Sequence, residues 1–288
     1  MTRRWRPFPQ VAGVEHLFID AGRLRMHLTE AGQGKPIVML HGWPQHWYVW
    51  RRVIPLLAPH ARILCPDLRG FGWTDAPNGG YDRETMAQDV LALLDELGLE
   101  SVDLVGHDWG GWIGFLLCLH HPHRIRRFVA LGILPPWPSR EPRNLLEVWR
   151  MAYQLPLAFP HVGRRAVAHG AARRALRIGS DAFSKGEIEV FADRLKGDRT
   201  RASELLYRTF LLREAVPVFA GRYAGIPFEV PTLLLLGGRD GVVPTRVARQ
   251  QAARASALEL HLVPEAGHFI VDEKPELVTD RTLRFFAR

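Results

Sequence analysis

The most informative residues of this chain are Gly106-His107-Asp108-Trp109-Gly110-Gly111. It follows an apolar run, Val102–Val105, that is typical of a buried strand, and it leads into Trp109–His120, which has the pattern of a helix. A strand, a sharp glycine turn and a helix together predict a nucleophile elbow. Glycines on both sides let such a turn tighten without Cβ clashes. The sequence therefore predicts that Asp108 lies at the tip of the turn as the nucleophile.

Aspartate at this tip, where serine is usual, changes the predicted chemistry. A serine alkoxide attacks an acyl carbon, whereas a carboxylate better suits displacement at a saturated carbon, which leaves an ester bond to the enzyme. Asp108 therefore moves the prediction away from ester hydrolysis.

Short apolar runs alternate with amphipathic stretches along the chain. Strands are predicted at His16–Ile19, Leu24–Thr29, Ile37–Leu40, Ile63–Pro66, Val102–Val105, Phe128–Leu131, Thr232–Leu236 and Leu258–Val263. Helices are predicted at Trp47–Leu57, Thr85–Leu97, Trp109–His120, Thr245–Ala253 and Lys274–Phe286. This alternation predicts an α/β fold with a mainly parallel, eight-stranded sheet that carries helices on both faces.

The alternation breaks between Pro135 and Phe228, where the pattern is helical and no convincing strand occurs. Prolines at both ends of this stretch mark places where the chain leaves regular structure. We therefore predict that residues 1–134 and 229–288 form one α/β core and that residues 135–228 form an inserted helical cap.

Bulk composition is that of a soluble globular protein, with 47% apolar and 24% charged residues. Cys65 and Cys118 both lie in apolar segments and form no disulfide framework, which is consistent with a reducing compartment. The basic start of the chain lacks the apolar stretch of a signal peptide, and no apolar run approaches the ~18 residues that span a bilayer. These features predict a cytoplasmic protein.

The net charge of +8 comes almost entirely from arginine. A basic balance can indicate nucleic acid or an anionic surface. Because the arginines are scattered and no nucleic-acid motif accompanies them, we predict neither a nucleic-acid nor a membrane partner. The densest basic patch, Arg164–Arg177, is either a solvated helix side or a partner face. A homodimer is compatible with the sequence.

Two backbone N–H groups are predicted to form an oxyanion hole. His41-Gly42-Trp43-Pro44 directly follows the third predicted strand, so the N–H of Trp43 can lie beside that of Trp109. The His-Gly-x-Pro pattern alone is weak, and its position after that strand strengthens it.

Two further residues follow the last two predicted strands and complete a triad. Asp240 lies in Gly237-Gly238-Arg239-Asp240-Gly241, where it either orients a histidine or simply belongs to a turn. His268 lies in Glu265-Ala266-Gly267-His268-Phe269. The chain order nucleophile, acid, histidine is the order expected for this fold. Asp108, Asp240 and His268 are therefore the predicted catalytic residues.

The predicted chemistry has two half-reactions. Asp108 attacks a carbon and forms an alkyl-enzyme ester, and His268, oriented by Asp240, then takes a proton from the water that hydrolyses it. The N–H groups of Trp43 and Trp109 hold the resulting oxyanion. These steps require no cofactor or metal, and the sequence has neither a phosphate-binding glycine loop nor metal-ligand spacing.

On these motifs, and on Asp67-Leu68-Arg69-Gly70-Phe71-Gly72, the chain resembles the α/β-hydrolase superfamily over almost its whole length. Within it, the chain resembles the epoxide hydrolases, in particular the actinobacterial type. The resemblance implies a small hydrophobic epoxide and water as substrates. Asp67 and Arg69 are taken as residues that structure their loop.

The resemblance also implies cap tyrosines that protonate the leaving alkoxide. Tyr207 matches the second tyrosine of the family, whereas Trp149 occupies the position of the first and Tyr153 that of a phenylalanine. Trp149 and Tyr153 are four residues apart and would share a helix face. Tyr153 is therefore a second donor, or Tyr207 acts alone. We expect Trp109, Trp149 and Tyr153 to contact the substrate.

Two other classes of function stay open, a dehalogenase and a non-catalytic binding protein. A haloalkane dehalogenase would hold halide with the indole N–H groups of Trp109 and Trp149, although dehalogenases usually carry Asn or Glu where this chain has Trp43. A fluoroacetate dehalogenase resembles the cap but would need arginines where Trp109 and Trp112 stand. A non-catalytic hydrolase-fold binding protein would have no need of His268.

Overall fold

The computed structural model describes residues 8–138 and 147–288, with the side chain of Val148 left out. Its centre is one eight-stranded sheet, in the order β1-β2-β4-β3-β5-β6-β7-β8. The strands are β1 (Glu15–Ala21), β2 (Leu24–Ala31), β3 (Pro36–Leu40), β4 (Arg62–Pro66), β5 (Val102–His107), β6 (Ile125–Leu131), β7 (Thr232–Gly237) and β8 (Leu258–Val263). All eight predicted strands are confirmed, most of them extended by a few residues.

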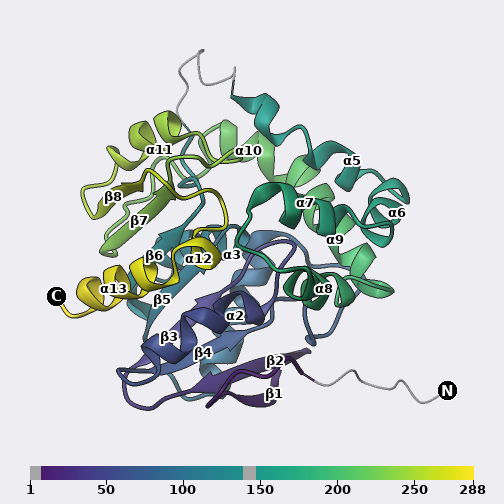
Figure 1. The fold of residues 1–288 in the computed structure, drawn as a ribbon. Helices are drawn as coiled ribbons and strands as arrows, with labels where there is room; N and C mark the ends of the chain where they lie inside the picture. Colours follow the sequence, from purple (N-terminus) through teal and green to yellow (C-terminus); the bar gives the residue numbers. More distant parts are fainter. Residues whose placement is uncertain (1–7, 139–146) are drawn as a thin grey trace.

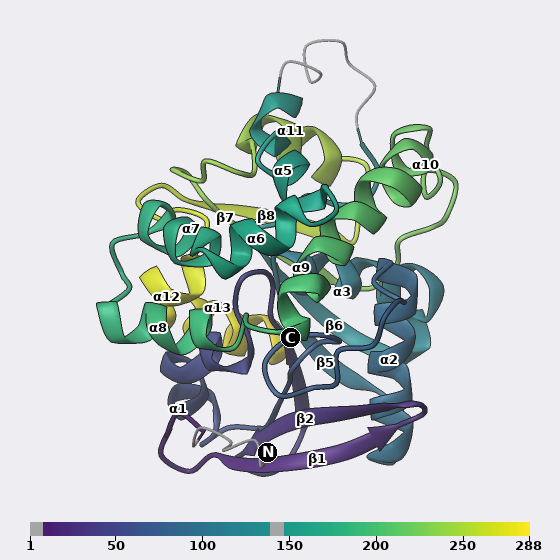
Figure 2. The same cartoon turned by 90° about the vertical axis from the view of Figure 1, so that its right-hand side faces the viewer.

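The six strands β4-β3-β5-β6-β7-β8 are parallel to their neighbours. At the other end of the sheet, β1 pairs antiparallel with β2, and β2 pairs antiparallel with β4. Because parallel strands all end at one edge, the residues that follow β3, β5, β7 and β8 meet there. Figure 1 shows this mixed sheet, and Figure 2 shows β1 and β2 at its end farthest from α11.

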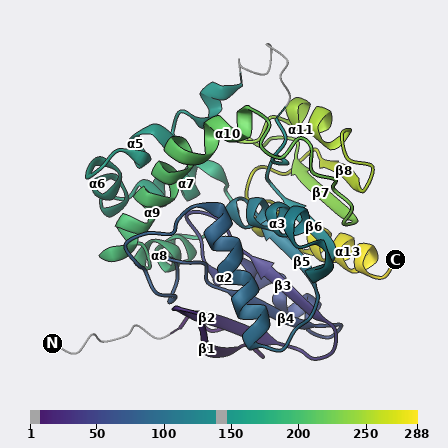
Figure 3. The same cartoon turned by 180° about the vertical axis from the view of Figure 1, so that it is seen from behind.

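Helices cover both faces of the sheet. On one face lie α2 (Arg83–Glu96) and α3 (Trp109–His120), which are in front in Figure 3. On the other lie α1 (Ile54–Leu57), α12 (Ile270–Glu273) and α13 (Pro275–Phe286). The helix α11 (Thr245–Ala252) follows β7, and a short 3-10 helix, η2 (Pro122–Arg124), precedes β6. Along β3, Val38 and Leu40 belong to the first hydrophobic core, whereas Ile37 and Met39 belong to the second. This two-residue alternation is what a strand buried on both faces requires.

The predicted helix Trp47–Leu57 is wrong as a single element. The chain instead forms a 3-10 helix, η1 (Trp47–Arg52), and restarts as α1, which carries Pro55 in its first turn. Proline has no N–H and its ring clashes with the carbonyl four residues earlier, so it is tolerated at the start of a helix but not inside one.

Between β6 and β7 the described chain is helical. This helical insertion, residues 147–228, contains η3 (Val148–Met151), α5 (Gln154–Ala158), α6 (Val162–Ala168), α7 (Ala171–Gly179), α8 (Lys185–Asp193), α9 (Asp198–Thr209), the π-helix η4 (Phe210–Glu214) and α10 (Ala215–Phe219). It lies beside the sheet edge where β3 and β5 end (Figures 1 and 2). In the part of the chain that the structure describes, no helix is both long and apolar enough to cross a membrane.

Candidate active site

Asp108 forms the tip of a sharp turn between β5 and α3. Its φ of +51° lies in a region that residues with a side chain rarely adopt. The turn is possible because α3 begins tightly against the sheet: a Cβ at Gly110 would strike the backbone of Leu40, and one at Gly106 the backbone of Gly110. The local sequence thus holds Asp108 in a constrained backbone conformation at the end of β5.

Two backbone donors meet this carboxylate. The N–H of Trp43 donates to Oδ2 of Asp108 at 2.9 Å. The backbone N–H groups of Trp109 and Trp43 both act to lower the pKa of Asp108. Gly42 allows this approach, since a Cβ there would fall on the carboxylate itself. The two predicted oxyanion donors therefore both act on the Asp108 carboxylate, and Trp43 donates to its Oδ2.

His268 and Asp240 complete the group from the ends of β8 and β7. Nδ1 of His268 lies 3.0 Å from Oδ2 of Asp240, and its Nε2 lies 3.9 Å from Oδ1 of Asp108. The first distance is a hydrogen bond and the second is too long for one. Asp240 is fixed in turn, because its other oxygen accepts the N–H groups of Val242 and Val243.

The charges of these residues depend on one another. Burial raises the pKa of Asp108 to about 6, although His268 and the two N–H donors oppose the rise. Burial alone would lower the pKa of His268, but the Asp240 carboxylate and then Asp108 outweigh it and raise that pKa to about 9. His268 in turn holds the pKa of Asp240 below its usual range, against burial. At neutral pH the site therefore holds an ionised Asp108 and a protonated His268.

Tyr207 and Tyr153 lie on the side of the site formed by the helical insertion. Tyr207, on α9, is only 1% exposed, and its ring meets those of Trp109 and Trp43 edge to face, with centroids 5.8 and 5.4 Å apart. The ring of Tyr153 meets Tyr207 at 6.1 Å. Burial, and then the negative charge of Asp108, raise the pKa of Tyr153, while burial, Tyr153 and Asp108 raise that of Tyr207. Both hydroxyls are thus neutral donors near Asp108.

Trp149 does not join this group. It is 68% exposed, and the guanidinium of Arg150 lies 5.4 Å from its ring centroid. The expectation that Trp149 and Tyr153 share a helix face is wrong. Trp149 belongs to a 3-10 helix that ends at Met151, and Tyr153 lies just before α5. The two residues are therefore not stacked on successive turns of one α-helix.

The chain matches a family model described as the alpha/beta hydrolase fold over residues 35–275. It is 32% identical to the soluble epoxide hydrolase of Corynebacterium sp. (strain C12) over 278 residues, which is 91% of this chain and 94% of that protein. The chain belongs to the α/β-hydrolase fold family. Within it, this match assigns the chain to the epoxide hydrolases.

Two other matches are informative about this α/β hydrolase. The solved structure of epoxide hydrolase CorEH without ligand has a TM-score of 0.84 and 29% identity, and the match covers 95% of this chain and 99% of that one. A fluoroacetate dehalogenase of Burkholderia sp is 37% identical over 130 residues, 43% of each chain. The first match extends over the whole fold, and the second over less than half of it.

Two supporting residues of this hydrolase escaped the sequence analysis. His107 is buried and directly precedes Asp108, and burial together with His268 lowers its pKa to about 3, so it is neutral. Its Nε2 lies 2.9 Å from the carbonyl oxygen of His268 and therefore carries the proton that it donates. Glu273, on α12, accepts the N–H of Gly267 at 2.5 Å. Both contacts fix the loop that carries His268.

Asp67 holds the loops on the other side of the hydrolase site. Its carboxylate accepts the backbone N–H groups of Trp47 and Trp73, at 2.8 and 2.9 Å, and lies 2.7 Å from Nδ1 of His27. Arg69 binds Asp89 on α2. These contacts agree with the expectation that Asp67 and Arg69 structure their loop.

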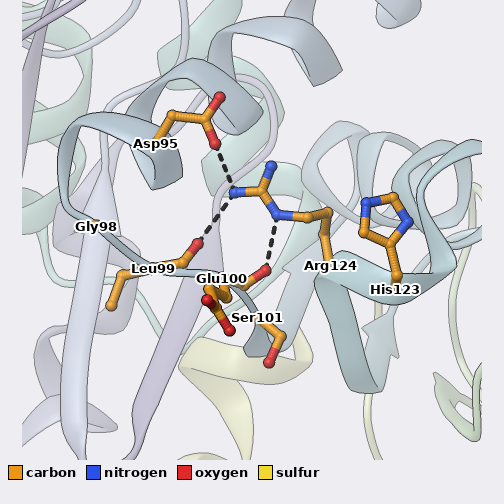
Figure 4. Close-up of a pocket in the computed structure, with 7 residues that line it drawn as sticks. All are labelled: Asp95, Gly98, Leu99, Glu100, Ser101, His123 and Arg124. Atoms are coloured by element: carbon orange, nitrogen blue, oxygen red, sulfur yellow. Dashed lines mark hydrogen bonds and ion pairs between the residues drawn. The ribbon is translucent and has the colours of Figure 1, made fainter.

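An open depression of about 580 Å³ lies at the opposite end of the sheet, where β5 and β6 begin (Figure 4). Its cation, Arg124, donates to the carbonyls of Leu99 and Glu100 and to Asp95. Because these acceptors lie at the end of α2 and in the turn that leads to β5, the guanidinium stabilises that turn. This depression is remote from Asp108 and offers no comparable chemistry.

Proposed function

We propose that this protein hydrolyses epoxides to vicinal diols through a covalent ester on Asp108. The observation that carries the proposal is the position of one carboxylate between two backbone donors, the Asp240–His268 pair and the hydroxyl-bearing rings of the helical insertion. The names of the relatives, which are epoxide hydrolases over nearly the whole chain, support the same reaction.

In the first step Oδ1 of Asp108 attacks an epoxide carbon. Oδ2 accepts the N–H of Trp43, so Oδ1 is the freer oxygen. The new carbon–oxygen bond forms as the epoxide bond breaks, and the leaving oxygen takes a proton from Tyr207. An alkoxide is a strong base, comparable to the anion of water, whose pKa is ~15.7, so it requires this proton. Tyr207 is buried and neutral, which suits it to the task.

Loss of the Asp108 charge prepares the second step. The ionised carboxylate is one of the causes that raise the pKa of His268. Once Asp108 is an ester, that cause is gone and the pKa of His268 falls. His268 then loses a proton as the Tyr207 phenolate regains one, and the proton count of the site is restored. The neutral imidazole is now a general base.

In the second step His268 removes a proton from water, and the hydroxide attacks the ester carbonyl. The charge that develops on Oδ2 is stabilised by the N–H of Trp43, which donates to this oxygen, and by the N–H of Trp109, which also acts on the Asp108 carboxylate. When the bond between the acyl carbon and Oδ1 breaks, the diol leaves with Oδ1 and a proton from His268. Asp108 keeps the oxygen of the water molecule.

We infer a hydrophobic substrate, with residues 135–228 acting as the cap over it. The rings of Trp43 and Trp109 meet the ring of Tyr207. The rings of Trp112 and Phe210 pack against Trp109 in turn, so the surroundings of Tyr207 are mostly aromatic and apolar. An apolar pocket with a few converging polar groups is typical of small-molecule sites.

A dehalogenase is the second candidate, and the fluoroacetate dehalogenase relative is the observation that favours it. A halide clamp formed by Trp109 and Trp149 is opposed by the 68% exposure of Trp149. Halide release also leaves the buried Tyr207 without a function.

Product analysis on the purified protein tests the proposal. Racemic styrene oxide and a primary bromoalkane are supplied separately, with Asp108→Asn as the control and its mass checked for reversion to aspartate. We expect the wild-type protein to form the diol from styrene oxide and to release no bromide from the bromoalkane. We expect the Asp108→Asn control to form no diol. Bromide without diol would favour the dehalogenase, and a ligand held without turnover would favour a binding protein; either outcome would overturn the proposal.

A further inference from the structure

A buried ion pair joins the α/β core to the helical insertion directly behind the catalytic tyrosine. Arg83 is the first residue of α2, and Glu214 is the last residue of the π-helix η4. Nε of Arg83 donates to Oε2 of Glu214 at 2.9 Å, and its second nitrogen donates to Oε1. The backbone N–H of Arg83 donates to the same carboxylate. Both residues are buried, so this is a desolvated, bidentate contact of the kind that fixes geometry.

The same guanidinium also contacts the two elements that carry the site. Its remaining nitrogen donates to the carbonyl of Leu206 at 3.0 Å, one residue before Tyr207. Its carbon lies 4.6 Å from the ring centroid of Trp109 and 5.2 Å from that of Phe210, a cation–π arrangement. Trp109 follows the nucleophile and meets the ring of Tyr207. Arg83 therefore contacts both Trp109, which follows Asp108 at the elbow, and the backbone carbonyl of Leu206, which precedes Tyr207.

The π-helix makes this contact possible. Residues 210–214 bond over five residues rather than four, which turns the following side chains relative to a continuous α-helix. Glu214 is buried against Arg83 of α2, whereas the two preceding residues of the segment, Leu212 and Arg213, are exposed. Single π turns inside helices occur often at functional sites.

We propose that Arg83 and Glu214 are positioning residues that hold Tyr207 against the leaving oxygen of the epoxide. This inference rests on the proposed function and adds residues to it. A buried ion pair is weak evidence for stability, because apolar residues of similar size often replace one without loss. The pair is better explained by the position that it gives to α9 than by the free energy of unfolding.

The test is the double variant Arg83→Met/Glu214→Leu, which leaves neither charge unpaired. Rapid-quench kinetics with styrene oxide separate formation of the alkyl-enzyme from its hydrolysis. We expect ester formation to slow by about 10- to 100-fold, as for a small displacement of a reacting group, and hydrolysis to change by less than about threefold. In a Tyr207→Phe background the same double change should cost ester formation less than about threefold, because the residue that it positions is gone.

A matched control comes from the same helix. Arg69 and Asp89 form an ion pair between the loop after β4 and α2, also largely buried. Arg69→Met/Asp89→Leu should alter thermal stability as much as the test variant does but keep the rate of ester formation. Arg83→Lys keeps the positive charge without the fork of donors and should give an intermediate rate.

Three results would overturn the inference. One is a folded double variant that forms the ester at the wild-type rate. Another is an equal loss in the Tyr207→Phe background. If the double variant does not fold, Arg83→Lys at the wild-type rate would contradict it in the same way. Wild-type protein that forms no ester from an epoxide would instead contradict the proposed function, so the two failures are distinguishable.

Discussion

The two tyrosines of the site are close together but are held very differently. Tyr207, on α9, is 1% exposed, and its helix is fixed to the core: the indole N–H of Trp43 donates to Ser203 at 3.1 Å, and Arg83 binds the carbonyl of Leu206. Tyr153 is 39% exposed and lies between the short helices η3 and α5. Proton donation requires a fixed distance to the leaving oxygen. The comparison therefore predicts that Tyr207 is the principal donor and Tyr153 an auxiliary one.

Removing His268, the proposed general base, separates ester formation, in which the tyrosines are proposed to act, from ester hydrolysis, in which they are not. In His268→Gln we expect turnover to fall by about 10⁴- to 10⁶-fold, as for loss of a triad member. The alkyl-enzyme should accumulate, because ester formation needs Asp108 and a tyrosine but no general base. Mass spectrometry of the quenched protein measures the ester. Absence of the ester together with slow diol formation would contradict the division into two steps.

The tyrosine variants test the comparison itself. We expect Tyr207→Phe to slow ester formation by about 10² to 10³-fold, within the range for loss of general acid catalysis, and Tyr153→Phe by about tenfold or less. Each phenylalanine keeps the ring and removes only the hydroxyl. Rapid-quench rates of ester formation measure both variants. Equal losses would show two equivalent donors, and a larger loss for Tyr153→Phe would reverse the assignment.

The pH dependence of ester formation distinguishes Asp108 from the two tyrosines, because their pKa values are far apart. Burial raises the pKa of Asp108 to about 6, and only the ionised form attacks. Ester formation should therefore fall as the pH drops through about 6, by about tenfold for each further unit. The pKa values of both tyrosines are raised above their usual range, so no tyrosine titration is expected near neutrality. Tyr207→Phe should show the same fall in rate below about pH 6. Loss of this fall in the variant would assign the titration to a group other than Asp108.

The smallest effect is expected at the exposed end of the same region. Trp149→Ala should change epoxide turnover by less than about threefold, because its ring is exposed and packs on Arg150. Steady-state kinetics with styrene oxide and with a bromoalkane provide the check. A large loss of bromide release in this variant would restore the halide clamp.

Residues whose role follows from their place after a strand were predictable from the sequence. Glycine spacing predicts the turn at Asp108, and apolar runs place Asp240 and His268 at the same sheet edge. The sequence prediction was wrong at Trp47–Leu57, where Pro55 restarts the helix, and at Trp149 and Tyr153, where a 3-10 helix replaces an α-helical turn. In both places the chain forms short helices that the spacing of apolar residues does not indicate.

Contacts between distant parts of the chain were not predictable. Arg83 and Glu214 are 131 residues apart, and their meeting depends on a π turn that no periodicity indicates. The support of His268 by His107 likewise spans 161 residues. Such pairs look like ordinary surface charges or core residues until the fold brings them together.

A single turnover in water labelled with heavy oxygen distinguishes attack by Asp108 on the epoxide from direct attack by water. Enzyme in excess is mixed with styrene oxide, and both the diol and the peptide that contains Asp108 are analysed by mass. If Asp108 forms an ester that water cleaves at its carbonyl, the first diol is unlabelled and Asp108 carries the label. A labelled first diol with an unlabelled Asp108 would mean that water attacks the epoxide directly, and it would contradict the account.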